Sequence, residues 1–219
     1  MSKEFVDILI TGFYETLYMT VVSLVIAYVL GIPLGVLMYI TDKKGISENS
    51  FVNGIFGAFI NIVRSVPFLI LLVAILPFTR LIVGTTIGST ATIVPLVVAA
   101  VPFAARLVES SLKEVDLGVI EAAKAMGASN LSIIAKVLLT EARPSLLVGL
   151  TISFGTVLGY SAMAGFVGGG GLGAIAINYG YYRYQNNIML VTVVILIVIV
   201  QVFQVLGNRL VNKIDKRLK

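Results

Sequence analysis

Long apolar segments without charged residues alternate with shorter polar segments along this chain. A helix needs about 20 apolar residues to cross the hydrocarbon core of a bilayer, which is roughly 30 Å thick. The pattern therefore predicts an all-α polytopic membrane protein with five transmembrane helices. These helices are expected near residues 17–41, 65–84, 88–108, 144–165 and 187–207.

The polar segment 109–143 is far longer than a typical connection of about 4–6 residues. Its apolar residues recur at helical spacing. Asp116 is an N-cap residue type, and Gly127 is placed to end the helix in a left-handed conformation. Ser129 or Asn130 can then cap a second helix. The apolar positions are Leu117, Ile120, Ala123 and Met126 in the first helix and Leu131, Ile134, Val137 and Leu138 in the second.

Composition supports a membrane protein and excludes several kinds of chemistry. The 219 residues are 58% hydrophobic and 12% charged, whereas a soluble domain carries about 25% charged residues. Cysteine, histidine and tryptophan are absent. Disulfides, thiolate or imidazole metal sites, and Ser-His-Asp or Cys-His catalysis are therefore excluded. We expect no cofactor.

The distribution of Lys and Arg predicts the orientation, because these residues accumulate in cytoplasmic loops. Of the 16 such residues, two lie in 42–50, five in 106–143 and five in the basic tail 209–219. These twelve place the three segments in the cytoplasm and the N-terminal segment 1–11 outside. The membrane domain is then expected over 12–208. The same distribution explains the net charge of +5 without a nucleic acid partner.

Two interpretations of the first loop helix remain open from its residues alone. An amphipathic helix can lie on the membrane surface, or it can dock into a groove of a cytosolic protein. Docking requires a small-residue face for close approach and a few charges for orientation. The small residues here are Ala122, Ala123, Ala125 and Ala128, and the charges are Glu121 and Lys124.

The stretch EAAKAMGASNLSIIAKVLL resembles the EAA signature of the membrane subunits of ABC importers, with Glu121, Ala122, Ala123 and Gly127 at matching positions. Thr140 stands where that signature has a proline. The resemblance implies a type I ABC importer permease fold in which this helix is the cytoplasmic coupling helix. The residues expected to meet the ATPase subunit are Glu121, Ala122, Ala123, Lys124, Gly127 and Ala128.

From about Gly12 to Leu210 the chain resembles the permeases of methionine uptake systems. The resemblance is carried by RSVPFLILLVAILPFTRLIVGTTIG and GYSAMAGFVGGGGLG. It implies a homodimer in the bacterial cytoplasmic membrane, with two ATP-binding cassette subunits and an extracytoplasmic substrate-binding lipoprotein. In such a protein Met163 is expected to narrow the translocation pathway, with Tyr160, Ser161 and Phe166 beside it. Ordinary packing, against lipid or against another helix, is the alternative role for Met163.

The glycine run GGGGLG formally fits the dinucleotide-binding pattern G-x-G-x-x-G. That fingerprint requires a preceding strand in a soluble βαβ unit, whereas here a membrane span precedes the run. Because glycine permits backbone conformations that other residues resist, we expect a hinge at Gly168, Gly169, Gly170 and Gly171.

These features distinguish three classes of function. A channel or ion-coupled transporter usually needs ionisable groups inside its spans, and the predicted spans hold essentially none. An intramembrane enzyme would need a Lys or paired carboxylates there. The remaining class is a permease subunit of an ATP-driven importer, without catalysis of its own. Methionine as substrate rests on the resemblance, and another small amino acid or solute is the alternative.

Overall fold

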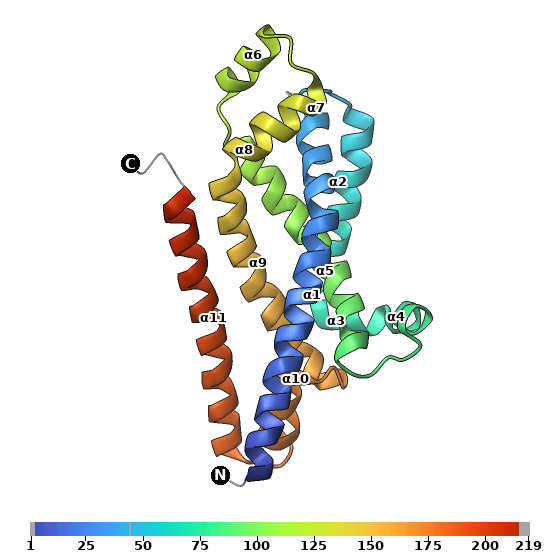
Figure 1. Cartoon of the computed structure of the whole chain (residues 1–219). Helices are drawn as coiled ribbons and strands as arrows, with labels where there is room; N and C mark the ends of the chain where they lie inside the picture. The colour runs from blue at the N-terminus through green and yellow to red at the C-terminus, as the bar shows by residue number, and fades with distance from the viewer. Residues whose placement is uncertain (1–2, 44, 215–219) are drawn as a thin grey trace. The chain divides into compact units, whose positions relative to one another are not determined.

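The computed structural model describes residues 3–43 and 45–214. Lys44 and the basic tail residues 215–219, which entered the charge distribution, lie outside the described residues. The described part is helical and contains no strand, and the predicted all-α class is confirmed. The elements are α1 (Lys3–Thr41), α2 (Ser50–Ser65), α3 (Phe68–Ala74), α4 (Leu76–Val83), α5 (Ser89–Lys113), α6 (Leu117–Ala125), α7 (Asn130–Ser132), η1 (Ile133–Leu138), α8 (Leu139–Glu141), α9 (Arg143–Ala164), η2 (Gly165–Val167), α10 (Gly171–Ile175), η3 (Ala176–Tyr181) and α11 (Asn186–Ile214) (Figure 1).

Within the described residues, four helices are long and apolar enough to cross a membrane: α1, α5, α9 with its η2 extension, and α11. A fifth span is obtained if α2 and α3, which meet at a 102° bend, are counted as one. With 39 residues, α1 is about 58 Å long at 1.5 Å per residue. It includes most of the segment that was expected to precede the membrane domain.

The second span expected over 65–84 is not a continuous helix, and this expectation is corrected. The chain breaks at Val66 and Pro67, because proline disfavours helical geometry in the residue before it and lacks an N–H for the ladder. Two short helices, α3 and α4, then follow, and α4 ends at Gly84 with φ +81°. Apolar length alone did not reveal that α2, which begins at Ser50, supplies the helix before the bend.

The described residues fall into two compact units. The first comprises residues up to Ala27, 66–100 and 153–204. In it Phe154 and Phe203 stack with ring centroids 3.6 Å apart. The second unit comprises Tyr28 to Ser65, 101–152 and the residues from Val205 on. Figure 1 shows α2 running beside the end of α1 in the second unit.

Small residues allow close helix contacts in the second unit. A Cβ added to Gly35 of α1 would lie 2.6 Å from the carbonyl oxygen of Ala105 on α5. A Cβ on Gly207 of α11 would overlap Oγ1 of Thr151 on α9. Such approaches are typical of membrane helices, which gain little from hydrophobicity when they associate in lipid.

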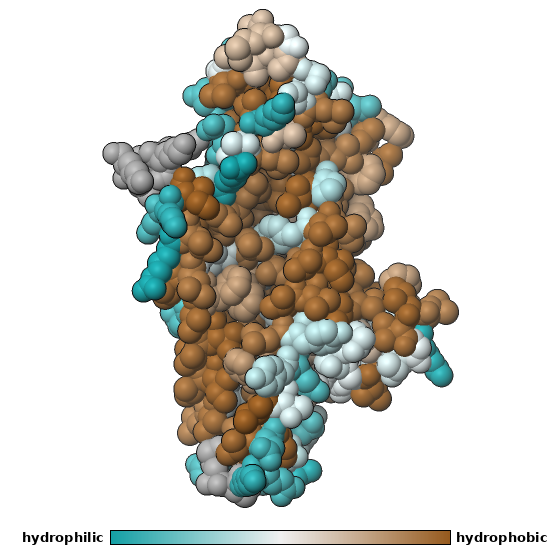
Figure 2. All heavy atoms as spheres, viewed as in Figure 1, coloured by the Kyte–Doolittle hydropathy of each residue, from teal (hydrophilic) through white to brown (hydrophobic). Residues whose placement is uncertain are grey.

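The flank of α11 is covered by apolar side chains (Figure 2). Only 6% of its most apolar window is buried within the chain. Residues spaced along the helix, such as Leu190, Val194 and Ile197, are more than half exposed. Water cannot solvate a surface of this kind at low cost, so lipid or another protein must cover it.

Candidate functional site

The helix α6 has defined caps at both ends. At its start, the Asp116 carboxylate accepts a hydrogen bond of 2.6 Å from the backbone N–H of Gly118. At its end, the N–H of Gly127 donates to the Lys124 carbonyl and the N–H of Ala128 donates to the Ala123 carbonyl. With φ +79° at Gly127, this pair of bonds is a Schellman motif. The predicted N-cap and glycine corner are both confirmed.

The second loop helix also follows its predicted cap. The Ser129 hydroxyl accepts a hydrogen bond of 3.3 Å from the N–H of Ser132. The helix continues through the π-helical turns of η1 into α8, which contains Thr140. Pro144 lies in the first turn of α9, where a missing N–H costs nothing. The exit from the loop is therefore helical although Thr140 replaces the proline of the signature.

One face of α6 is buried against the rest of the second unit. Ile120 and Ala123 are 5% and 4% exposed. They belong to a buried apolar cluster that also contains Tyr39, Val108, Leu112, Val115, Ile133, Leu138 and Ala142. Because Ala123 lies in this cluster, it holds α6 in place and offers little surface to a partner.

The opposite face of α6 is exposed. Glu121, Ala122, Lys124 and Gly127 all lie on it, and Ala128 is half-buried. Large apolar side chains are exposed on and beside it: Leu117 (55%), Met126 (82%) and Leu131 (79%). This combination of small, charged and exposed apolar residues is typical of a docking helix.

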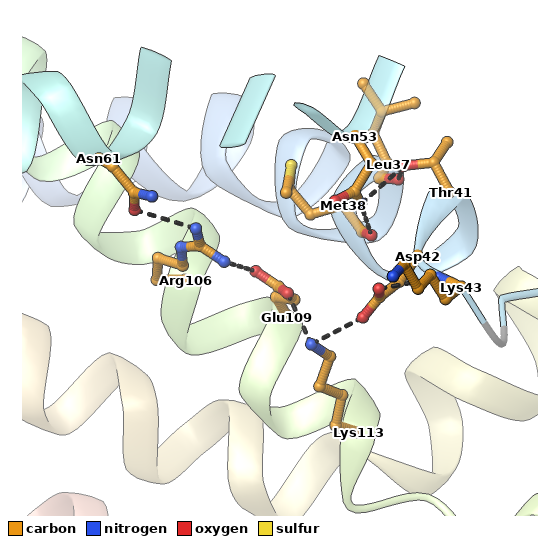
Figure 3. A network of polar contacts seen from close by, with 10 residues as sticks. All are labelled: Leu37, Met38, Thr41, Asp42, Lys43, Asn53, Asn61, Arg106, Glu109 and Lys113. Atoms are coloured by element: carbon orange, nitrogen blue, oxygen red, sulfur yellow. Dashed lines mark hydrogen bonds and ion pairs between the residues drawn. The ribbon is translucent and has the colours of Figure 1, made fainter. Parts of the chain in front are cut away.

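A charged network lies around the C-terminal end of α5, the helix that precedes α6 (Figure 3). Glu109 of α5 is 4% exposed. Its carboxylate accepts hydrogen bonds from Arg106 Nη1 at 2.6 Å and from Lys113 Nζ at 2.8 Å. Lys113 Nζ also lies 2.9 Å from Asp42 Oδ2, just after α1. Arg106 Nη2 donates to Asn61 Oδ1 of α2 at 3.0 Å.

The ammonium of Lys113 is the main reason that the pKa of Asp42 is lowered, and the backbone N–H of Lys43 adds to the effect. Asn53 of α2 donates to the carbonyl oxygen of Met38 at 2.8 Å and to Thr41 Oγ1 at 3.1 Å. The network thus joins α1, α2 and α5. Sequence reasoning missed it, although Arg106, Glu109 and Lys113 have the i, i+3, i+7 spacing of an ion-paired helix face.

The glycine run in the first unit is bound closely to α1. The N–H of Gly171 donates to the Glu15 carboxylate at 2.6 Å, and the N–H of Leu172 donates to Thr16 Oγ1 at 2.8 Å. Gly168, Gly170 and Gly171 have φ values of +83°, +82° and +74°. Glycine is therefore required here by the backbone conformation.

The remaining predicted site residues lie at the end of α9 and in η2. Tyr160 stacks on Phe68 with ring centroids 4.4 Å apart. Ser161 is 1% exposed and donates its hydroxyl hydrogen to the Leu158 carbonyl at 2.8 Å. Met163 and Phe166 are 43% and 53% exposed. The described residues therefore leave Met163 and Phe166 partly uncovered, whereas the Ser161 hydroxyl is bound within its own helix.

Residues 31–219 match the model of the family described as "Binding-protein-dependent transport system inner membrane component". The chain belongs to this family. It is therefore a multi-pass component of a transport system in the inner membrane. The match includes α6, the charged network and the glycine run.

Relatives of this inner membrane component have high identity over nearly its whole length. A probable D-methionine transport system permease protein of Vibrio cholerae is 56% identical over 211 residues, covering 96% of this chain and 94% of the relative. A methionine import system permease protein of Bacillus subtilis is 46% identical over 204 residues, covering 93% and 92%.

Solved structures agree with this assignment. A chain of a methionine ABC transporter in an inward-facing conformation has a TM-score of 0.97 and 47% identity, covering 99% of this chain and 100% of that one. A chain of an amino acid ABC transporter has a TM-score of 0.80 at 19% identity, covering 96% and 95%. The second likeness shows the fold alone, and the expected type I importer fold is confirmed.

Proposed function

We propose that this chain is the permease subunit of an ATP-driven methionine importer. In this proposal two copies form the translocation pathway, two separate ATP-binding cassette subunits hydrolyse ATP, and an extracytoplasmic lipoprotein delivers the substrate. The observation that carries the proposal is the backbone likeness to the methionine transporter chain, with a TM-score of 0.97 at 47% identity.

The exposed face of α6 is the proposed contact with the ATPase subunit. Glu121 and Lys124 supply orienting charges, and Met126 supplies exposed apolar area. The buried face, through Ile120 and Ala123, fixes α6 to the rest of the second unit. A displacement of α6 by the ATPase would therefore be passed to the helices that share this buried cluster. Only a partner whose affinity differs between two conformations can drive such a shift.

The exposed apolar flank of α11 supports insertion in lipid and contact with a second copy. A dimer doubles the number of helices available to enclose a pathway. We place Met163 and Phe166 along this pathway because their side chains are exposed. Tyr160, three residues before Met163 on α9, is held in place by its stack on Phe68. The glycine run is the proposed hinge at the outer end of α9, and its Gly171 is hydrogen-bonded to Glu15 of α1.

The proposed orientation puts the N-terminus outside and α6 in the cytoplasm. It rests on the distribution of Lys and Arg, of which five lie in residues 106–143 alone. Labelling of single cysteines tests it directly, since the chain has no natural cysteine. A cysteine at exposed Lys3 should react with an impermeant reagent in intact cells, and one at exposed Ala125 should not.

Reconstitution in proteoliposomes tests the substrate. The permease, its ATPase and its binding protein are assembled, and ATP-dependent uptake of L- and D-methionine is compared with uptake of other amino acids. We expect uptake of methionine that requires both ATP and the binding protein. Uptake of a different amino acid in place of methionine would contradict the substrate and support the alternative permease. Uptake without ATP would contradict the importer mechanism itself.

A further inference from the structure

Glu109 is the buried centre of the charged network at the end of α5. Its side chain is 6% exposed, compared with 49% for Lys113 and 41% for Asp42. A buried carboxylate must be paired, because an unpaired buried charge is strongly unfavourable. Both available cations, Arg106 and Lys113, are directed at it (Figure 3). The geometry of these three residues is therefore fixed by Glu109 rather than by the exposed partners.

The two cations extend from Glu109 to two other helices. Arg106 also binds Asn61 of α2, and Lys113 also binds Asp42 at the end of α1. Lys113 is the last residue of α5, and the N-cap of α6 follows at Asp116. The chain between them is held by Val115, which is 4% exposed. The start of α6 is thus held close to the Lys113–Asp42 ion pair by the buried side chain of Val115.

We propose that Glu109 is a positioning residue that couples the movement of α6 to α1 and α2. This inference rests on the proposed function. When a partner displaces α6, the end of α5 moves with it. The bonds of Glu109 to Arg106 and Lys113 then make α1 and α2 follow as one body. Without the Glu109 charge, α6 remains folded on its apolar cluster, which still contacts α1 through Tyr39. The polar links from α5 to α1 and α2 are weakened, so the displacement of α6 is passed on less completely.

The variant Glu109→Gln tests the proposal in the complete reconstituted transporter. Glutamine keeps the size of the side chain but loses the charge that holds Arg106 and Lys113. We expect the ATPase subunits to co-purify with the variant. We expect the amount of solute imported per ATP hydrolysed to fall by at least about twofold, which is the scale of effect for residues within a coupling network.

Two further variants make the result specific. Asp42→Asn removes only the link to α1, and its half-exposed position makes loss of folding a small risk. It should lower the amount of solute imported per ATP by less than Glu109→Gln does. Glu114→Gln is the matched control, because Glu114 is an exposed acid one residue beyond Lys113 with no ion pair among the described residues. Its ratio should equal that of the wild type.

The outcomes separate this inference from the function on which it rests. If the wild-type complex imports solute with ATP but Glu109→Gln and Asp42→Asn leave the ratio unchanged, Glu109 has no positioning role. A second outcome would also overturn the inference. Both variants could lose part of their ATPase binding while the complexes that still form import the same amount of solute per ATP. Glu109 would then have a purely structural role. Failure of the wild type to use ATP for import would instead contradict the proposed function.

Discussion

The carboxylate of Glu15 accepts a hydrogen bond of 2.6 Å from the backbone N–H of Gly171, although the two residues are 156 positions apart in sequence. Thr16 makes the next bond, to Leu172, at 2.8 Å. Together these bonds satisfy two N–H groups at the start of α10, which have no partner within their own helix. The end of the glycine run therefore joins α1 to the start of α10 through two hydrogen bonds.

Gly171→Ala should destabilise the protein. The residue has φ +74°, and an added Cβ would lie 2.6 Å from Thr16 Oγ1 and 2.8 Å from Met19 Cε. Backbone strain of this kind costs of order 1–3 kcal/mol, and the overlap adds to it. Thermal unfolding in detergent, followed by circular dichroism, should show a lower midpoint. Gly159→Ala is the control, because Gly159 is helical with nothing within 4 Å, and an unchanged midpoint for both would refute the prediction.

Gly127→Ala should weaken assembly with the ATPase. No atom lies within 4 Å of a Cβ added here, so the effect comes from the backbone at φ +79°. A residue other than glycine pays roughly 1–2 kcal/mol in this conformation, and Asn tolerates it best. The fraction of ATPase that co-purifies should therefore fall in the order Gly, Asn, Ala. Equal recovery for Asn and Ala would indicate that the left-handed corner is not what the partner requires.

Glu121→Lys should leave insertion and folding intact but remove ATPase assembly or coupling. Glu121 is exposed on the face of α6 opposite the buried cluster, so its reversal disturbs no internal contact among the described residues. Recovery in the membrane fraction measures insertion, and ATP-dependent uptake measures coupling. Glu48→Lys, a reversal at an exposed acid outside α6, is the control. Normal uptake by Glu121→Lys would argue against the docking role.

Stability should depend on pH through Asp42. Its pKa is lowered by the Lys113 ammonium, so the folded protein holds its proton less tightly than the unfolded chain does. The stabilisation is complete above the unfolded value of about 3.9 and is lost as pH falls through the folded pKa. The effect is small and weakened by salt, because the pair is partly exposed. Asp42→Asn should show a shallower loss of thermal stability in acid, and parallel pH profiles would contradict this.

The sequence predicted the loop helices well, because their signals are local. Asp116, Gly127 and Ser129 each act within a few residues, and the structure places each where the cap rules require it. The helical class also followed from apolar runs alone. The bend at Pro67 was harder, since a run of apolar residues looks alike whether it continues straight or turns.

Contacts between distant segments could not be predicted in the same way. Glu15 precedes the first predicted span, and nothing in its neighbours in sequence indicates Gly171 as its partner. Ser161 was expected beside the pathway, and only the structure shows that its hydroxyl is bound to Leu158. Glu109 has a local spacing signal, but Asp42, just after α1, and Asn61 of α2 extend the network and are distant in sequence.

The bond between Glu15 and Gly171 also constrains the order in which the chain matures during synthesis. The N-terminal helix emerges first, and most of the chain must be made before the α10 N–H groups exist. Until then the Glu15 carboxylate has to remain hydrated near the membrane surface. The first helix can therefore enter the bilayer early, but its final contacts must wait until the segment around Gly171 has been synthesised.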